Sequence, residues 1–234
     1  MVQLNLRSRS GEPDKFPKEY SIKSKIHEYG GGAGTMTHDG RFVFVDGYTD
    51  GVFKTEPHHG KTEEILRGDK KLRYADFDAH PINHELIVAI QEDHRGKEVI
   101  NSLALINSQT KTTKVLVEGA DFYSHPKFSH DGKMICWMQW NHPDMPWTGS
   151  EVYIADFEGG KVGKTTKVAG EAKKISIAQP KWHLDDTLLY GSDITGFWQL
   201  YRYDTKTREI ERLEIEGYEE AELAGREFIL GACV

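Results

Sequence analysis

Cysteine and long apolar segments are both scarce in this chain. Cys136 and Cys233 are the only cysteines among 234 residues, too few for a disulfide framework. No run of apolar residues approaches the roughly 20 needed to cross a bilayer as a helix, and Met1–Ser10 lacks the apolar core of a signal peptide. We therefore expect a soluble protein of the cytoplasm.

Positive charge is also in deficit. Lysine and arginine total 30 against 37 aspartates and glutamates, which leaves a net charge of −7. Nucleic acids and anionic membranes are bound through a basic face. The composition therefore argues against either as the main partner.

The common catalytic motifs are missing. The chain has no Gly-x-Ser-x-Gly nucleophile elbow, and Ser192, the nearest serine, has no glycine two residues later. It has no His-Glu-x-x-His or Cys-x-x-Cys, and the glycine-rich run Gly30–Gly34 lacks the Gly-Lys-Ser/Thr ending of a phosphate loop. We therefore predict no catalytic residue, no metal and no cofactor within this chain.

What the sequence does contain is a four-fold repeat, in which a polar turn leads into a short apolar run. The runs begin at Phe42, Leu86, Ile135 and Leu188, spaced 44, 49 and 53 residues apart. Short strands repeating every 40–50 residues are the sequence signature of β-propeller blades. The prediction is an all-β fold of about four blades, each a four-stranded antiparallel sheet.

The repeat also predicts the boundaries within the chain. Residues 1–26 are expected to form an irregular or edge segment and residues 27–234 a partial propeller, with blades starting near 36, 80, 126 and 180. A further blade is expected to begin near 226, after a helical stretch over Glu219–Arg226. The apolar runs do not alternate with polar residues, which is typical of strands buried on both faces, and we expect them to be the innermost strands.

Histidines recur before the apolar runs, at His38, His130 and His183. A residue type repeated once per blade indicates a structural role in turns rather than ligands that converge on one ion.

Two loops are richer in functional side chains than a turn requires. They follow the second and third apolar runs, over Gln91–Glu98 and Trp140–Glu151. Because they occupy the same place in successive blades, they should emerge on one face, and loops on rigid scaffolds carry function disproportionately. The alternative is that they are solvated turns held by tryptophan. The candidate substrate-facing residues are Glu92, Asp93, His94, Trp140, His142, Asp144, Trp147 and Glu151.

Five segments in the same order resemble a known family: His27–Gly32, Arg73–Asp76, Glu92–His94, Asp121–Tyr123 and His142–Trp147. Over about residues 20–232 the chain resembles the N-terminal propeller of prolyl oligopeptidase-family serine peptidases, in the acylaminoacyl-peptidase and dipeptidyl-aminopeptidase-like branch. The resemblance implies a seven-bladed propeller, which filters peptides, followed by an α/β-hydrolase domain with a Ser-Asp-His triad. The first blade, the last blades and the hydrolase domain have no counterpart here, so no triad residue can be assigned.

Two hypotheses follow. In the first, the chain is the substrate-gating propeller portion of a serine peptidase that cleaves short peptides, and its partner is an α/β-hydrolase domain or a completing subunit. Carboxylates of the two loops would then hold a peptide's free amino terminus through charge-assisted hydrogen bonds, and Trp140 and Trp147 would form a wall for its side chain. In the second, the chain is a stand-alone propeller-like binding module. A metal-dependent propeller enzyme is disfavoured, because the apolar runs supply few carboxylates.

Overall fold

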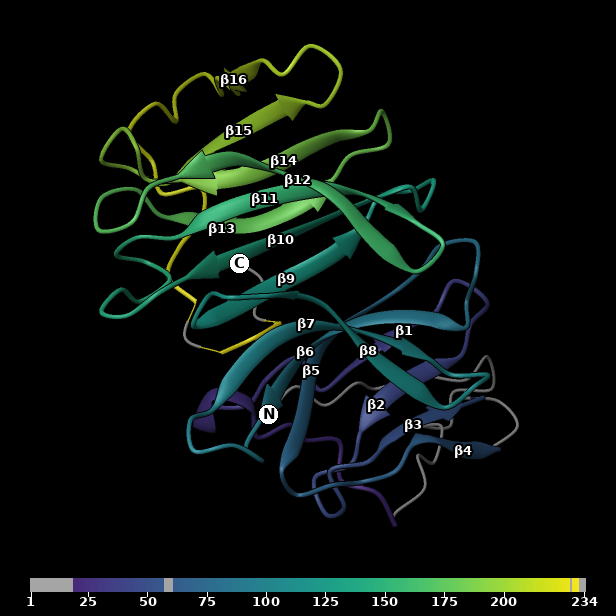
Figure 1. Ribbon diagram of the computed structural model, residues 1–234. Coiled ribbons are helices and arrows are strands. Elements are labelled where there is room, and N and C mark those ends of the chain that lie inside the picture. Colours follow the sequence, from purple (N-terminus) through teal and green to yellow (C-terminus); the bar gives the residue numbers. More distant parts are fainter. Residues whose placement is uncertain (1–18, 57–60, 228, 232–234) are drawn as a thin grey trace, which may run out of the picture.

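The structure, a computed structural model, describes residues 19–56, 61–227 and 229–231. Within these residues it contains four antiparallel sheets, each made of four strands that are consecutive in sequence (Figure 1). We call them blades 1 to 4. One short 3₁₀ helix, η1 (Ile26–Glu28), precedes blade 1. No helix in these ranges is long and apolar enough to span a bilayer.

The strands have the following bounds. Blade 1 contains β1 (Gly34–Met36), β2 (Phe42–Val45), β3 (Val52–Thr55) and β4 (Thr62–Leu66); blade 2 contains β5 (Leu72–Ala79), β6 (Leu86–Asp93), β7 (Ile100–Asn107) and β8 (Thr112–Glu118). Blade 3 contains β9 (Phe122–Phe128), β10 (Met134–Trp140), β11 (Glu151–Glu158) and β12 (Lys161–Gly170); blade 4 contains β13 (Ile177–Trp182), β14 (Thr187–Ser192), β15 (Gln199–Asp204) and β16 (Ile210–Arg212).

The inner strand of each blade is the one that precedes the apolar run. β1 contacts β5, β5 contacts β9, and β9 contacts β13, so these four strands line the centre of the arrangement. The apolar runs are the second strands, β2, β6, β10 and β14, and the expectation that they are innermost is wrong. The physical reason is that the second strand of blade 2 or blade 3 has a neighbouring blade against each face, whereas the inner strand borders the central axis.

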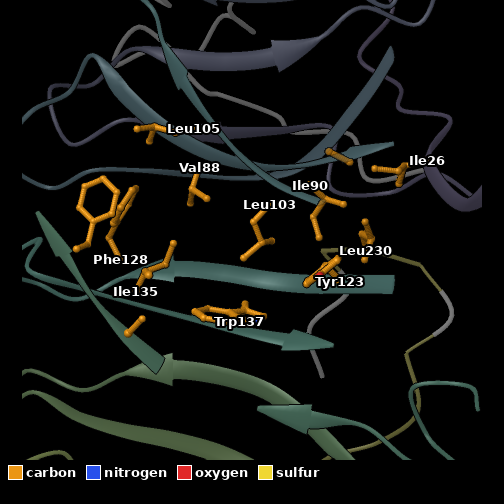
Figure 2. Close-up of a cluster of buried hydrophobic side chains, with 13 residues drawn as sticks. Ile26, Val88, Ile90, Leu103, Leu105, Tyr123, Phe128, Ile135, Trp137 and Leu230 are labelled. Atoms are coloured by element: carbon orange, nitrogen blue, oxygen red, sulfur yellow. The ribbon is translucent and has the colours of Figure 1, made fainter. Parts of the chain in front are cut away.

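Strand β6 illustrates this two-sided burial. Ile87 and Ala89 pack into the cluster between blades 1 and 2, while Val88 and Ile90 pack into the cluster between blades 2 and 3 (Figure 2). All four side chains are fully buried, and burial of an aliphatic side chain is worth about 1.5–3 kcal/mol. The blades are therefore held together mainly by apolar packing between the faces of their sheets, to which the inner, second and third strands all contribute.

The inner strands of blades 2, 3 and 4 share a bulge. Asp76 in β5, His125 in β9 and Gln179 in β13 have left-handed backbones, with φ of 53°, 53° and 49°, and each lies where the pairing with the next strand shifts register. The backbone N–H of Asp76 donates to the Gly32 carbonyl at 2.7 Å, and that of His125 donates to Asp76 Oδ2 at 2.6 Å. Adjacent blades are thus joined at their bulges by hydrogen bonds.

The histidine turns also join neighbouring blades. His80 occupies the same place in blade 2 as His130 does in blade 3. His80 Nε2 lies 3.1 Å from the Gly132 carbonyl, and His130 Nε2 lies 3.3 Å from the Trp182 carbonyl. These side chains therefore meet backbone of the following blade rather than one another.

The predicted helix over Glu219–Arg226 is wrong, because this stretch forms turns and bends. Strand β15 and the residue before it hold the stretch in an irregular path. Gln199 Nε2 donates to the Ala221 carbonyl at 2.7 Å, and the Leu223 N–H donates to the Trp198 carbonyl at 2.7 Å. Backbone groups that a helix would pair internally are therefore used in contacts with blade 4.

Residues 224–227 and 229–231 form what we call the terminal segment. It runs from blade 4 back towards the middle of the molecule (yellow in Figure 1), where Leu230 forms a single parallel bridge with Gly31. Leu230 also packs with Ile26 in the cluster between blades 2 and 3. Phe228, expected to belong to a further blade, lies outside the described residues, as do residues 1–18 of the expected N-terminal segment.

Candidate functional site

A cavity of about 230 Å³ opens between the loops around η1, the start of blade 3 and the terminal segment. Four predicted residues line it, all from the loop between β10 and β11 or the end of β10: Trp140, His142, Asp144 and Trp147. A larger groove of about 900 Å³ runs between blades 2 and 3 around His80 and Phe157. That groove contains none of the predicted residues and is bordered by scattered charges, so we take the smaller cavity as the candidate site.

One wall of the cavity is aromatic. The rings of Phe122 and Trp140 are stacked with centroids 5.5 Å apart. His27 approaches both rings edge-on, at 5.2 Å from Phe122 and 6.2 Å from Trp140, and His142 meets Phe122 edge-on at 4.9 Å. Stacked and edge-to-face contacts of this kind hold the rings in fixed orientations. The wall is therefore a preformed surface for an apolar or cationic group.

Burial keeps one of these rings neutral. Burial lowers the pKa of His27, and the opposing effect of the Glu92 carboxylate does not cancel it. The lowered pKa favours the uncharged imidazole, so His27 contributes to the wall as a flat, weakly polar ring.

Another wall of the cavity is polar. His125 Nε2 lies 3.3 Å from Glu227 Oε2, and the two side chains are only 7% and 10% exposed. Burial lowers the pKa of His125, but the adjacent Glu227 and Asp76 carboxylates outweigh it and raise the pKa above its usual value. Four buried atoms of cavity-lining side chains have no hydrogen-bond partner within the described part of the chain: His27 Nε2, His125 Nδ1, His125 Nε2 and Glu227 Oε1. The cavity thus combines a buried ion pair with several polar atoms that make no hydrogen bond.

Glu92 and His94 lie behind the cavity rather than on its surface. Glu92 Oε2 accepts the His27 N–H at 2.7 Å, and Glu92 Oε1 lies 2.7 Å from His94 Nε2. Glu28, Glu92 and His94 are close enough to share a metal ion. Arg73, however, contacts Glu28 and lies 3.5 Å from Glu92 Oε1, so a guanidinium already supplies the positive charge there. Glu92 therefore positions the backbone of His27.

The remaining predicted carboxylates are engaged elsewhere. Asp93 pairs with Arg95 at 2.6 Å, and Glu151 contacts Lys167 and accepts a hydrogen bond from the Tyr153 hydroxyl at 2.8 Å. Asp144 lines the cavity, but its oxygens accept bonds from the Thr148 hydroxyl at 3.2 Å and the Lys173 N–H at 2.8 Å. Asp144 therefore organises its own loop.

Sequence reasoning missed four residues that shape the cavity: His27, Phe122, His125 and Glu227. His27 and Phe122 fall within the segments that carry the family resemblance. The signal for His125 was its place before Pro126, matched by Gln179 before Pro180 in the next blade. Glu227 gave no signal, because only the return of the terminal segment brings it to blade 3.

Neither family models nor curated protein sequences match the chain. Among solved structures, a puromycin-hydrolysing peptidase of Mycobacterium tuberculosis matches with a TM-score of 0.81 and 26% identity, over 92% of this chain and 35% of that one. A puromycin hydrolase matches with a TM-score of 0.77 and 26% identity, over 88% of this chain and 34% of that one. The resemblance to prolyl oligopeptidase-family peptidases is confirmed.

The fold prediction is confirmed as well. The four four-stranded blades form an incomplete, unclosed propeller. An oligogalacturonate lyase of Vibrio parahaemolyticus, at 16% identity and a TM-score of 0.61, shares this fold over 77% of the chain and 52% of its own length. The chain spans about a third of the length of the two puromycin-hydrolysing proteins.

Proposed function

We propose that the chain is the substrate-gating propeller portion of a serine-type peptidase that acts on short peptides. The observation that carries the proposal is the cavity. It presents an aromatic wall and a buried ion pair, and it is formed by segments of a fold matched over 92% of its length to a puromycin-hydrolysing peptidase. Bond cleavage itself would require an α/β-hydrolase domain or subunit, because this sequence has no nucleophile elbow.

The propeller's part in such a reaction is selection and orientation. A preformed apolar wall with a few polar groups is the usual design of a small-ligand site. Holding a peptide against a fixed wall lowers the entropic cost of bringing its scissile bond to a nucleophile. We therefore expect the cavity to contribute to KM and to the choice of peptide, and the hydrolase domain to supply the chemical step.

The test is direct peptide binding to the 234-residue chain. Tryptophan fluorescence reports on it, because Trp140 and Trp147 line the cavity. Trp147→Ala should weaken binding of short peptides about tenfold, a typical loss for an aromatic contact. Tyr48→Ala is the matched control, because Tyr48 is 68% exposed in a turn of blade 1. No binding by the unmodified chain, or equal binding by both variants, would remove the basis of the proposal.

The alternative, a stand-alone binding module, uses the same cavity without a hydrolase. The two are separated by an immunoblot of source cells and by activity of the captured material. A polypeptide well above 26.6 kDa, whose immunoprecipitate hydrolyses puromycin and is inhibited by a serine-directed fluorophosphonate, supports the peptidase. A 26.6 kDa band that binds peptides without cleaving them supports the module.

A further inference from the structure

The outer strands of blades 3 and 4 carry opposite charge. Strands β12 and β16 are the last strands of these sheets, and within the described residues each pairs with a neighbouring strand on one side only (Figure 1). The free side of such a strand presents unpaired backbone N–H and C=O groups, which can pair with another chain. We call β12 with the turn after it, residues 161–174, the basic edge, and β16 with its flanking residues, 209–222, the acidic edge.

The basic edge contains five lysines and one glutamate, a net charge of +4. All five lysines are exposed. Two of them pair with nearby glutamates. The other three have no ion pair among the described residues: Lys161, Lys164 and Lys173. This edge therefore offers three ammonium groups to an acidic partner.

The acidic edge contains seven glutamates and one arginine, a net charge of −6. All seven glutamates are exposed. Arg212 lies 3.5 Å from Glu214, and this is the one ion pair of the edge within the described residues. None of the ion pairs in the described part of the chain joins the two edges. The opposite charges of one molecule are therefore available to other molecules.

The charges determine which contacts between edges are favourable. Strand β12 is ten residues long and contains no proline, and it is protected by its lysines and by two register shifts in its pairing with β11. Lysines on an edge strand keep identical edges apart by like-charge repulsion, and the glutamates do the same for the acidic edge. Neither edge can therefore pair with itself, but the basic edge attracts the acidic edge of another copy.

We propose that copies of this chain associate head to tail through these two edges. The basic edge of one copy contacts the acidic edge of the next, so that each copy uses two different surfaces. A heterologous contact of this kind builds a ring or an open chain rather than a symmetric dimer. Neither edge contains a residue that lines the candidate site. Self-association is therefore independent of the proposed function and goes beyond it.

Sedimentation velocity of the unmodified chain measures the association. At an ionic strength of about 0.1 M, charges are screened beyond about 10 Å, so facing side chains attract while the overall charge of −7 opposes contact only weakly. The sedimentation coefficient should rise with protein concentration at about 0.1 M and stay constant at about 1 M, where the screening length is about 3 Å. A chain that stays monomeric at the lower ionic strength, or that associates equally at both, would overturn the proposal.

Glutamine substitutions at charges without an ion pair assign the two edges. The basic-edge variant combines Lys161→Gln, Lys164→Gln and Lys173→Gln. The acidic-edge variant combines Glu209→Gln, Glu211→Gln and Glu216→Gln. Each variant alone should associate about tenfold more weakly than the unmodified chain, as expected for the loss of three exposed ion pairs.

A matched control removes the same amount of charge from exposed positions elsewhere, with Lys23→Gln, Lys70→Gln and Lys71→Gln. It should associate as the unmodified chain does. All of these side chains are exposed, so the substitutions leave the packed core intact.

An equimolar mixture of the two edge variants tests the head-to-tail arrangement. Each variant keeps one native edge, so the mixture should form a 1:1 dimer with the affinity of the unmodified contact. Growth beyond the dimer should be about tenfold weaker, because both remaining edges have lost charges. Absence of the dimer, larger species at the affinity of the unmodified chain, or unchanged association of either variant alone would overturn the arrangement. None of these results affects peptide binding at the candidate site, which a separate assay measures.

Discussion

Attachment of the terminal segment should weaken as the pH rises. The His125–Glu227 ion pair ties this segment to blade 3. The charged groups facing His125 are Glu227 and Asp76, which raise its pKa, while burial and the nearby Lys127 oppose them, and the net direction is upward. A raised pKa in the folded state means that the stabilisation is fully present below the ordinary histidine pKa. It is lost as the pH passes through the raised value.

The size of the effect follows from the contacts that remain. When His125 deprotonates, the buried Glu227 carboxylate loses its neighbouring cation, and breaking a buried pair in this way costs at most about 3–5 kcal/mol. The other contacts of the segment include the apolar side chain of Leu230, 7% exposed and worth about 1.5–3 kcal/mol. A loss of about 3 kcal/mol increases the population of the detached state roughly 150-fold. Detachment would remove Glu227 and Leu230 from the cavity wall.

Hydrogen exchange followed by mass spectrometry measures this directly. Peptides that cover Leu223 and Leu230 should lose protection between pH 6 and pH 9, after correction for intrinsic exchange rates. Peptides from β6, whose side chains are fully buried at Ile87–Ile90, serve as the internal reference. Glu227→Gln should abolish the pH dependence. Equal protection of the segment at both pH values, or an unchanged dependence in the variant, would refute the reasoning.

Three further predictions concern the scaffold. Trp137→Ala should lower the free energy of unfolding by about 3–5 kcal/mol, measured by urea denaturation, because Trp137 is fully buried between blades 2 and 3 (Figure 2). Gly32→Ala should lower the thermal midpoint, because its Cβ would lie 2.7 Å from the backbone N of Asp76; a Gly40→Ala control meets no neighbour. Glu85→Ala should cost about 2–3 kcal/mol in the same urea assay, because it leaves the Lys54 ammonium, 4% exposed, without its 3.0 Å partner.

The second strands of the blades could be predicted from the sequence because burial on both faces requires an uninterrupted apolar run. Ile135 and Trp137 face blade 2 while Cys136 and Met138 face blade 4, so the run is apolar at every position. The inner strands have no such apolar run. Strand β9 contains Ser124, His125 and Pro126 within seven residues, a composition typical of a turn. It is a strand because β10 and the adjacent blades supply its partners.

The candidate site was predictable to the extent that it lies in one loop. Trp140 and Trp147 stand out as aromatics after a strand, and both line the cavity. The carboxylates were harder to rank, because an acidic side chain in a loop looks the same whether it is free or engaged. Asp93 and Asp144 are held by neighbours in three dimensions, whereas Glu227 keeps a buried, unpaired oxygen. For Asp144 that distinction depends on Lys173, which is distant in sequence, whereas the partner of Asp93 lies only two residues away.

In blades 2 to 4, the bulge position of the inner strand carries a polar side chain that faces the centre of the arrangement. In blade 2 it is Asp76, whose carboxylate accepts the backbone N–H of His125 and so joins two blades. In blade 3 it is His125, which faces the cavity, and in blade 4 it is Gln179, whose Nε2 is buried with no hydrogen-bond partner in the described chain. A left-handed residue interrupts the strand pairing at this point and turns polar groups towards the centre. The repeat that builds the scaffold therefore also supplies one inward-facing polar residue in each of blades 2 to 4, and ligand recognition can change there without disturbing the packed second strands.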